Sequence, residues 1–203
     1  MDERPPATAF ESLALTGLGQ VIGAPCDPRG YLKTGKLRKF MGEQDAMAVV
    51  ATGRALESAG LAGSLGERVG LYLAVGYIPF EEHDIAGLLE HSMDDSGFSM
   101  ELFTTKGYDA FNPLLTFRCL TNMPAYHISV NFDIRGPYFV TYPGIGQWYS
   151  ALAEACTALQ SSQIDVALVG AVAHQRNFLV AHHFSRIPAP VPVESLIDSA
   201  GCI

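Results

Sequence analysis

Position 145 and its neighbours have the residue types and spacing that bear most directly on chemistry. The segment Tyr142-Pro-Gly-Ile-Gly146 joins an apolar run, residues 138–142, to a series of strong helix formers. A strand-to-helix turn places one side chain at a helix N-terminus, where the dipole and the free N–H groups favour an anion. Enzymes put a nucleophilic serine or cysteine at such an elbow. This turn holds only tyrosine, proline, glycine and isoleucine, so the sequence predicts the architecture of a nucleophile site without its nucleophile.

The histidines and cysteines form no recognisable ligand set. Only His182 and His183 are adjacent among six histidines, and adjacent side chains point in different directions in regular structure. The sequence has no H-E-x-x-H motif and no Cys/His zinc spacing. Its four cysteines include no C-x-x-C pair and are too few for a disulfide scaffold. We therefore predict no metal and no cofactor.

Four cations lie within seven residues of this acidic chain, namely Lys33, Lys36, Arg38 and Lys39. One interpretation is a solvated segment that leads into the following helix. The alternative is a docking patch for an acidic partner such as a carrier protein, through long-range attraction. The sequence leaves both open.

The glycines at positions 17, 19 and 23 superficially resemble a dinucleotide-binding loop after a strand. That motif requires a helix to begin at its last glycine, so that backbone N–H groups meet a pyrophosphate. Pro25, Pro28 and Gly30 exclude such a helix. We interpret Gly17-Leu-Gly19 as a tight turn after a strand at residues 12–16.

The remaining patterns predict strands that alternate with helices, which is typical of an α/β layered fold. Helix formers predict a helix over 43–59, stopped by Gly60, and a second helix over 147–161 with an apolar stripe. Runs apolar on both faces predict buried strands at 68–76 and 164–173. Residues 126–134 fit either a strand or a helix by periodicity alone. Carboxylates crowd residues 81–101, and we expect an excursion from the domain over 81–112.

Composition limits the class of protein. The chain has 203 residues, of which 48% are hydrophobic and 17% charged, and this excludes intrinsic disorder. A net charge of −8 is the wrong sign for a nucleic-acid binder. No signal peptide is visible, and the longest apolar run, residues 69–80, is too short to span a bilayer. We expect one cytoplasmic domain, with part of its surface covered by a partner.

Taken together, the motifs resemble the N-terminal half of a β-ketoacyl-acyl-carrier-protein synthase, a member of the thiolase-like superfamily. The resemblance covers nearly the whole chain, which would be a single half domain with a mixed central sheet flanked by helices. It rests on motifs that occur in the family's order: Ala14–Gly19, Arg68–Tyr72, Asn122-Met123 with His127, Gly136-Pro137, and Asp165–Gly170.

The resemblance assigns roles to particular positions. It implies a helix over 121–133, in which His127 is structural. The family's nucleophilic cysteine falls at position 145 whether it is counted forward from Pro137 or backward from Asp165, and this chain has Ile145 there. A hydrocarbon side chain cannot accept an acyl group. The family's catalytic histidines belong to its second half, which has no counterpart here, and Cys156 is better interpreted as core.

The resemblance therefore implies a non-catalytic subunit, similar to the chain length factors that pair with an active ketosynthase in type II polyketide or fatty-acid biosynthesis. The expected partner is that ketosynthase, in a heterodimer or heterotetramer, with the acyl carrier protein bound indirectly. Half-length partners of this kind resemble those of aryl polyene clusters. The residues expected to shape the acyl tunnel or meet the partner are Phe111, Leu114, Leu115, Phe117 and Gln147.

An alternative function is a carrier-bound acyl decarboxylase or hydrolase that works without a cysteine nucleophile. It would use Gln147 or a histidine. Gln147 lies two residues after the nucleophile position, which counts against this alternative. A third interpretation is a decayed gene fragment, although the intact apolar stripe over 148–159 favours a selected fold.

Overall fold

A five-stranded mixed sheet organises the chain. The computed structural model describes residues 13–203 except 24, 62, 64, 79–81, 145 and 189–191. The strand β2 (Val69–Val75) pairs in parallel with both β5 (Tyr138–Thr141) and β6 (Val166–Ala173), whereas β7 (Ser199–Cys202) pairs antiparallel with β6 and with β1 (Gly19–Ile22). The α/β class with a mixed central sheet is thereby confirmed. In spatial order the strands are β1, β7, β6, β2 and β5.

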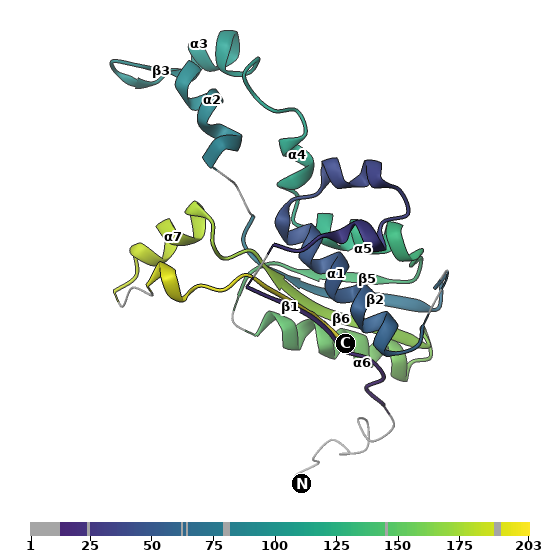
Figure 1. Ribbon diagram of the computed structural model, residues 1–203. Helices are drawn as coiled ribbons and strands as arrows, with labels where there is room; N and C mark the ends of the chain where they lie inside the picture. Colours follow the sequence, from purple (N-terminus) through teal and green to yellow (C-terminus); the bar gives the residue numbers. More distant parts are fainter. Residues whose placement is uncertain are drawn as a thin grey trace.

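Helices cover both faces of this sheet (Figure 1). On one face, α1 (Glu43–Ser58) packs against β1, β7 and β6, and α5 (Met123–Phe132) packs beside it. On the other face, α6 (Gln147–Gln160) packs against β2, β5 and β6. On this face, α6 therefore covers the half of the sheet formed by β6, β2 and β5. The side chains of Gln20 and Ile22 on β1 remain exposed.

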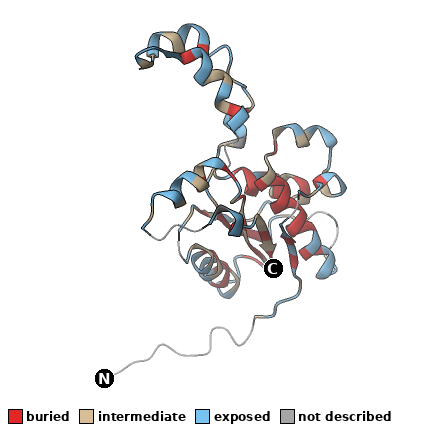
Figure 2. Ribbon diagram, turned by 60° about the vertical axis from the view of Figure 1, so that its left-hand side comes forward, coloured by how far each residue is buried: buried red, intermediate tan, exposed pale blue. Residues whose placement is uncertain are grey.

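Two apolar cores hold these layers together. The larger lies between α1 and the sheet, where Val49 and Leu71 are fully buried. The smaller lies under α6, where Ala151, Ala155 and Val169 pack together. Figure 2 shows the burial concentrated in the sheet and α1. Both strands that were predicted to be apolar on two faces, β2 and β6, lie between these cores, which explains their composition.

Most predicted elements are confirmed. The helix predicted over 43–59 is α1, and Gly60 follows it with a φ of +67°, the left-handed conformation that ends helices. The predicted helix 147–161 is α6. The ambiguous segment, residues 126–134, is mostly helical and belongs to α5. This agrees with the helix that the family resemblance implies, whereas periodicity alone left strand and helix open.

The first strand is a correction. Pairing begins at Gly19, opposite Cys202, and residues 13–18 form no regular element. Residue 12 of the predicted strand lies outside the described residues. Gly17 and Gly19 are not a tight turn either. A Cβ atom on Gly19 would lie 2.0 Å from the carbonyl oxygen of Ala51, and one on Gly17 would lie 2.3 Å from that of Ala55. The two glycines let this chain segment lie directly against α1.

The segment between β2 and α5 extends away from the sheet as an arm (Figures 1 and 2). We define the arm as residues 82–112. Its elements pack mainly on one another, and its charge is strongly acidic, with seven carboxylates and one lysine. They are α2 (Glu82–Ser92), the hairpin of β3 (Met93–Asp94) and β4 (Gly97–Phe98), α3 (Met100–Leu102) and the π-helix η3 (Phe103–Gly107).

The remaining elements are short. Two 3-10 helices, η1 (Pro28–Tyr31) and η2 (Gly35–Phe40), lead into α1. The helix α4 (Leu115–Arg118) connects the arm to α5. Beyond β6, α7 (Phe178–Ser185) and η4 (Val193–Ser195) precede β7.

Candidate functional site

The turn between β5 and α6 is an elbow at the carboxyl end of a parallel strand. β5 ends at Thr141 and α6 begins at Gln147. Gly146, directly before the helix, has a φ of +85°, a conformation that glycine adopts without strain. Gln147 donates its backbone N–H to the carbonyl of Gly144 at 3.3 Å. The predicted architecture is thus present, with the strand β5 before position 145 and the helix α6 after it. Ile145 itself lies outside the described residues.

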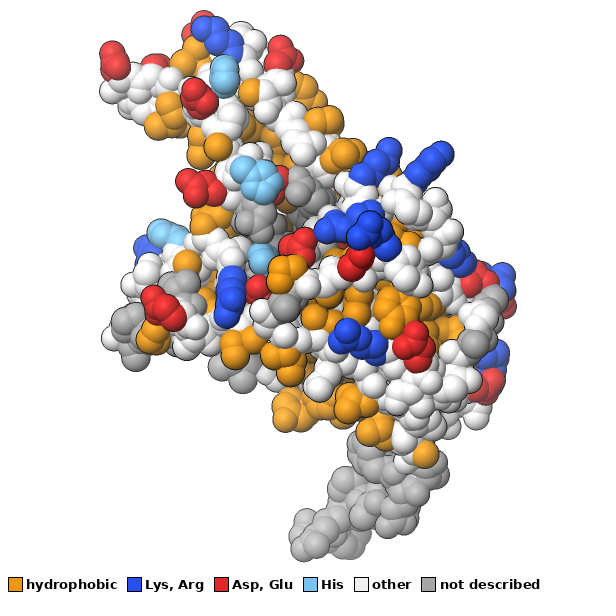
Figure 3. Space-filling view, viewed as in Figure 1, with side chains coloured by type: hydrophobic (Ala, Val, Ile, Leu, Met, Phe, Trp, Pro, Cys, Tyr) orange, Lys and Arg blue, Asp and Glu red, His pale blue; other side chains and the backbone are white. Residues whose placement is uncertain are grey.

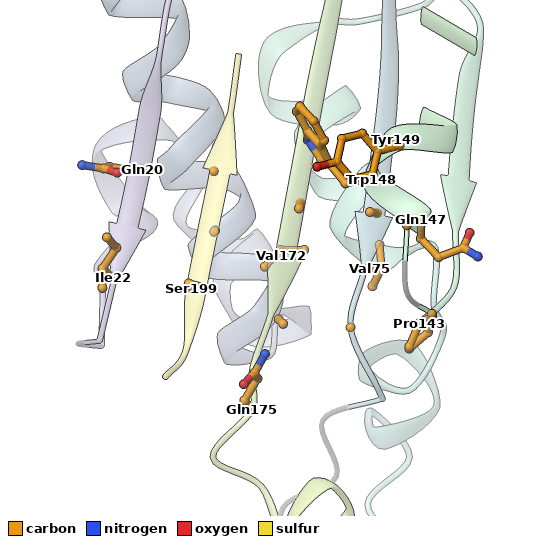
Figure 4. Close-up of a pocket in the computed structure, with 18 of the residues that line it drawn as sticks. Gln20, Ile22, Val75, Pro143, Gln147, Trp148, Tyr149, Val172, Gln175 and Ser199 are labelled. Carbon is orange, nitrogen blue, oxygen red and sulfur yellow. The ribbon is translucent and has the colours of Figure 1, made fainter. Parts of the chain in front are cut away.

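A cavity of about 590 Å³ opens beside this elbow. Figure 4 shows it between β1 and β7 on one side and the start of α6 on the other. Its floor consists mainly of small residues from the strands. Its polar side chains are three glutamines, one serine, one tyrosine and one tryptophan. The described lining residues are Leu18, Gln20, Ile22, Ala74, Val75, Gly76, Pro143, Gly144, Gly146, Gln147, Trp148, Tyr149, Ala171, Val172, Ala173, Gln175, Ser199, Ala200 and Gly201.

The composition of this lining limits its chemistry. Among the described lining residues there is no carboxylate, histidine, lysine, arginine or cysteine. General acid–base catalysis near neutral pH depends on such groups. The side chain of Gln147 folds over the elbow, with its amide nitrogen 3.1 Å from where a Cβ of Gly144 would lie. Its carboxamide points away from Gln20 and Ser199 across the cavity (Figure 4).

The cysteine thiols with a shifted pKa are protonated rather than activated. Burial raises the pKa of Cys156, which lies on the inner face of α6 as predicted for a core residue. Burial also raises the pKa of Cys202 to about 12. For Cys26, burial raises the pKa first, and Glu43 adds to the effect. An activated nucleophile requires the opposite shift.

Two of the six histidines, His127 and His174, are buried, and the other four are exposed. His127 is fully buried in α5, and neither ring nitrogen has a hydrogen-bond partner. Burial lowers its pKa, and the backbone of Phe40 opposes this effect only in part. The structural role implied for His127 agrees with this position. His183 on α7 lies with Nε2 3.4 Å from the hydroxyl of Tyr77, outside the cavity lining.

The predicted tunnel or interface residues do not lie in one place. Gln147 lies at the elbow, whereas Leu114 and Leu115 are at the start of α4, and Leu115 is only 2% exposed. Phe111 is half-buried at the end of the arm. Phe117 is exposed and packs edge-to-face on Phe40, with ring centroids 5.7 Å apart.

Phe117 lines an apolar groove of about 370 Å³ that sequence reasoning did not identify as a whole. The groove is bounded by η2, α4 and α5, and the described residues around it are Leu37, Phe40, Phe117, Leu120, Met123 and Tyr126. Tyr126 also borders a second hollow that reaches Tyr138 on β5. We call the exposed residues Phe117, Leu120, Tyr126 and Tyr138 the apolar strip. It ends at the outer edge of the sheet, since β5 pairs only with β2 among the described strands.

The predicted cationic segment lies beside this strip, on and before η2. Figure 3 shows Lys and Arg side chains gathered on this side of the body. The side chains of Lys33, Lys36 and Lys39 are exposed. Arg38 differs, because it donates to the carbonyl of Met41 at 3.0 Å and pairs with Glu43 at 3.2 Å. Three of the four cations are therefore available to a partner and the fourth stabilises the entry to α1.

Neither a metal centre nor a membrane segment is found in the described part of the chain. Its His, Cys, Asp and Glu side chains form no group of three or more that could hold a metal ion. None of its helices is both long enough and apolar enough to cross a membrane.

Comparisons with known proteins identify the fold. The family model for the N-terminal domain of β-ketoacyl synthases matches residues 7–191. No curated protein is significantly similar to the chain in sequence.

Several solved structures share the fold at low identity. One is the AntDE:AntF complex, a type II PKS acyl-carrier protein in complex with its ketosynthase (TM-score 0.65, 16% identity, covering 85% of this chain and 53% of that chain). Another is the ishigamide ketosynthase/chain length factor (TM-score 0.61, 18% identity, 87% and 46%). A third is a β-ketoacyl synthase from Burkholderia phymatum STM815 (TM-score 0.59, 17% identity, 83% and 43%). The chain spans about half the length of these proteins.

Proposed function

The chain belongs to the family of β-ketoacyl synthase N-terminal domains, and from this premise we propose that it is a non-catalytic, chain length factor-like subunit. In this role it binds an active ketosynthase, stabilises it and helps to shape the tunnel for the growing acyl chain. The observation that carries the proposal is the residue at the elbow, because the chain has Ile145 where the resemblance to the family places the nucleophilic cysteine.

The surroundings of the elbow support this proposal. The described lining of the adjacent cavity has no ionisable acid or base apart from the phenol of Tyr149. The shifted thiols of Cys26, Cys156 and Cys202 all have raised pKa values. Acyl transfer needs both a nucleophile and a group that moves its proton. Neither function has a candidate residue at this elbow in the described structure.

The apolar strip supports a partner at the β5 edge of the sheet. Phe117, Leu120, Tyr126 and Tyr138 expose large apolar side chains along one surface. Interfaces are enriched in exposed aromatic residues of this kind. The outer edge of β5, which no described strand pairs with, also offers backbone groups to another chain. Of the residues proposed for this interface or for the tunnel, Phe117 belongs to the strip, and Leu114 and Leu115 stand at the start of the same short helix, α4. Phe111 precedes that helix at the end of the arm, and its contribution remains part of the proposal.

The biosynthetic setting follows from the same premise. Structures with this fold include a type II PKS ketosynthase complex with an acyl-carrier protein and a ketosynthase/chain length factor. We propose a type II polyketide or fatty-acid pathway, with an aryl polyene as the candidate product class. Lys33, Lys36 and Lys39 would attract an acidic carrier protein to the surface beside the strip.

The second candidate function is decarboxylation or hydrolysis of a carrier-bound acyl group. The observation in its favour is that Gln147 lines the cavity at the elbow. Release of carbon dioxide from malonyl-carrier protein by the purified chain alone would support this second function and contradict the first.

Co-expression of this chain with its proposed partner, an active ketosynthase, tests the proposed function. The two chains should co-purify as one species, with one chain of each kind per heterodimer or two per heterotetramer, and the ketosynthase should lose activity when this chain is omitted. Size-exclusion chromatography with light scattering gives the stoichiometry. Two separately monomeric proteins, and a ketosynthase equally active without this chain, would contradict the proposal.

A further inference from the structure

The apolar groove bounded by η2, α4 and α5 has the size and lining of a ligand site. Its volume of about 370 Å³ lies within the roughly 300–1,000 Å³ that is typical of small-molecule sites. The only hydroxyl among its described lining side chains belongs to Tyr126. These walls lie between residues 37 and 126, and none of them lines the cavity beside the elbow. The groove is therefore separate from the elbow.

The 3-10 helix η2 places positive charge at the rim of this groove. A 3-10 helix has three residues per turn, so side chains three positions apart lie one above the other. Leu37 and Phe40 share the face that lines the groove, and Lys36 and Lys39 share a neighbouring face. The Nζ atom of Lys39 lies 4.8 Å from the centre of the Phe40 ring. An ammonium group consequently stands at the edge of the apolar lining.

The two lysines are available to a ligand. Both side chains are exposed, and neither forms an ion pair with a described residue. Arg38, which lies between them, is directed to the carbonyl of Met41 and to Glu43. It therefore neutralises the nearest carboxylate of α1. In a chain with a net charge of −8, this rim is a local site of positive charge.

We propose that the groove binds a single-chain anionic amphiphile, namely a free carboxylic acid with one alkyl chain. The hydrocarbon chain would lie between η2, α4 and α5, where its burial is favourable. The carboxylate would meet the ammonium groups of Lys36 and Lys39 at the rim, where ion pairs select the sign of the charge more than they add affinity. This proposal goes beyond the proposed function and does not depend on a ketosynthase, because every residue of the site belongs to this chain.

The groove and its rim favour this ligand over other occupants. A small inorganic anion would make no use of the apolar lining, and a cationic amphiphile would be repelled by the lysines. A bilayer is a flat apolar partner, whereas Met123 is only 6% exposed at the base of the groove. A single chain can enter to that depth. An alkyl carboxylate therefore matches both the shape of the groove and the charge of its rim.

Calorimetric titration with decanoate provides the first test. Binding should saturate at one decanoate per chain. Octanoate should bind about tenfold more weakly, because each of the two missing methylenes contributes about fourfold when it is buried. Decyltrimethylammonium has the same chain and the opposite charge, and it should bind at least about tenfold more weakly than decanoate. Equal affinity for decanoate and decyltrimethylammonium would overturn the proposal.

A double variant, Lys36→Glu with Lys39→Glu, tests the rim. It should bind decanoate about tenfold or more weakly and decanol within about twofold of the unchanged chain, which shows that the groove itself is intact. The matched control is Lys106→Glu with Arg186→Glu, two exposed cations elsewhere on the chain. It changes the net charge equally and should bind decanoate as the unchanged chain does. An equal loss in the control would assign the effect to net charge and overturn the proposal.

Leu120→Glu tests the lining. Leu120 is 53% exposed on the wall of the groove, so the fold should be retained. A carboxylate there should weaken the binding of both decanoate and decanol about tenfold or more. Ile197→Glu, at 48% exposure and outside the lining, is the matched control and should change neither affinity. If the two variants bind decanoate equally well, the ligand does not occupy this groove and the proposal is wrong.

Two further measurements test the nature of the occupant. Vesicles of phosphatidylcholine and phosphatidylglycerol in equal amounts should leave the chain in the supernatant after sedimentation. Binding to these vesicles that is lost in the double lysine variant would assign the rim to a membrane and overturn the proposal. The decanoate titration is then repeated on the protein purified from cells that make it. The same affinity supports the proposal, and a protein that binds no decanoate overturns it.

Discussion

The hydroxyl of Thr141 donates a 3.4 Å hydrogen bond to the backbone carbonyl of Gln147, and it thereby joins the last residue of β5 to the first residue of α6. A second bond, from the N–H of Gln147 to the carbonyl of Gly144, closes the turn between them. Both bonds are formed by residues other than position 145. These two bonds do not involve the side chain at position 145, and the chemistry of the elbow depends on which residue stands there.

Replacement of Ile145 by alanine should leave the condensing activity of the complex unchanged within about twofold. A hydrocarbon side chain takes part in no bond-making step, whereas removal of a true nucleophile costs about a thousandfold or more. The measurement is the rate of product formation by the co-purified pair. Substitution of the partner's nucleophilic cysteine is the positive control. A loss of similar size for Ile145→Ala would contradict a non-catalytic elbow.

Alanine substitutions at Leu115 and Phe117 should distinguish an effect on stability from an effect on the shape of the tunnel. Leu115→Ala creates a cavity at a fully buried position and should lower the free energy of unfolding by about 2–5 kcal/mol. Phe117→Ala removes an exposed ring and should change stability far less. If these positions shape the tunnel, each variant in the complex should give longer acyl products, because methylenes can occupy the vacated volume. Urea titration and product mass spectrometry measure the two effects.

Unchanged product length in both variants would remove this part of the chain from the tunnel. A Phe117→Ala variant that is as unstable as Leu115→Ala would show that the ring of Phe117 contributes to the core instead.

Tyr138→Glu should weaken association with the ketosynthase. Tyr138 is 64% exposed on the edge strand β5, and a buried, unpaired carboxylate at an interface is costly. We expect the dissociation constant to rise about tenfold or more. Tyr149→Glu is the matched control, because Tyr149 is 70% exposed on α6 and lies away from the apolar strip. A larger effect for Tyr149→Glu would place the partner on the α6 face.

The buried ring of His127 should make stability depend on pH. Burial lowers its pKa, so the unfolded chain binds a proton near pH 6.5 that the folded chain does not bind until a lower pH. Its contribution is fully present above pH 6.5 and is lost as pH falls toward the folded pKa. His127→Met should therefore flatten the decline of the urea midpoint between pH 7 and pH 5.

His182→Met, on the exposed surface of α7, is the control for that titration. Equal slopes for His127→Met and the unchanged chain would contradict a neutral, buried His127.

The elements with strong local patterns could be predicted from the sequence. Helix α1 is composed of helix formers and ends at a glycine, and β2 and β6 are apolar on both faces because a core lies on each side. The elbow could also be predicted, because glycine and proline lie between a predicted strand and a run of helix formers, and these two residue types mark a turn. Helix α5 could not be assigned from periodicity, because the packing against α1 that accompanies the burial of His127 and Ile128 is a tertiary effect.

Other features depend on contacts between distant segments. The start of β1 is set by its pairing with Ser199–Cys202, about 180 residues later in the chain, and Gly17 and Gly19 are required by the close approach of α1. Apart from Phe117, the residues of the apolar strip could not be predicted, because Tyr126 on α5 and Tyr138 on β5 come to border one hollow only in the folded chain. Exposed tyrosines in an acidic chain were the available signal, but composition does not say which of them share a surface.

Intact-mass spectrometry of both subunits during turnover shows directly whether this chain ever carries an acyl group. The reconstituted pair is supplied with acyl- and malonyl-carrier protein and sampled before the reaction is complete. For a non-catalytic subunit, we expect the ketosynthase partner to gain the mass of the acyl group while this chain keeps its unmodified mass throughout. An acyl adduct on any residue of this chain, formed and consumed at the rate of product formation, would contradict the account.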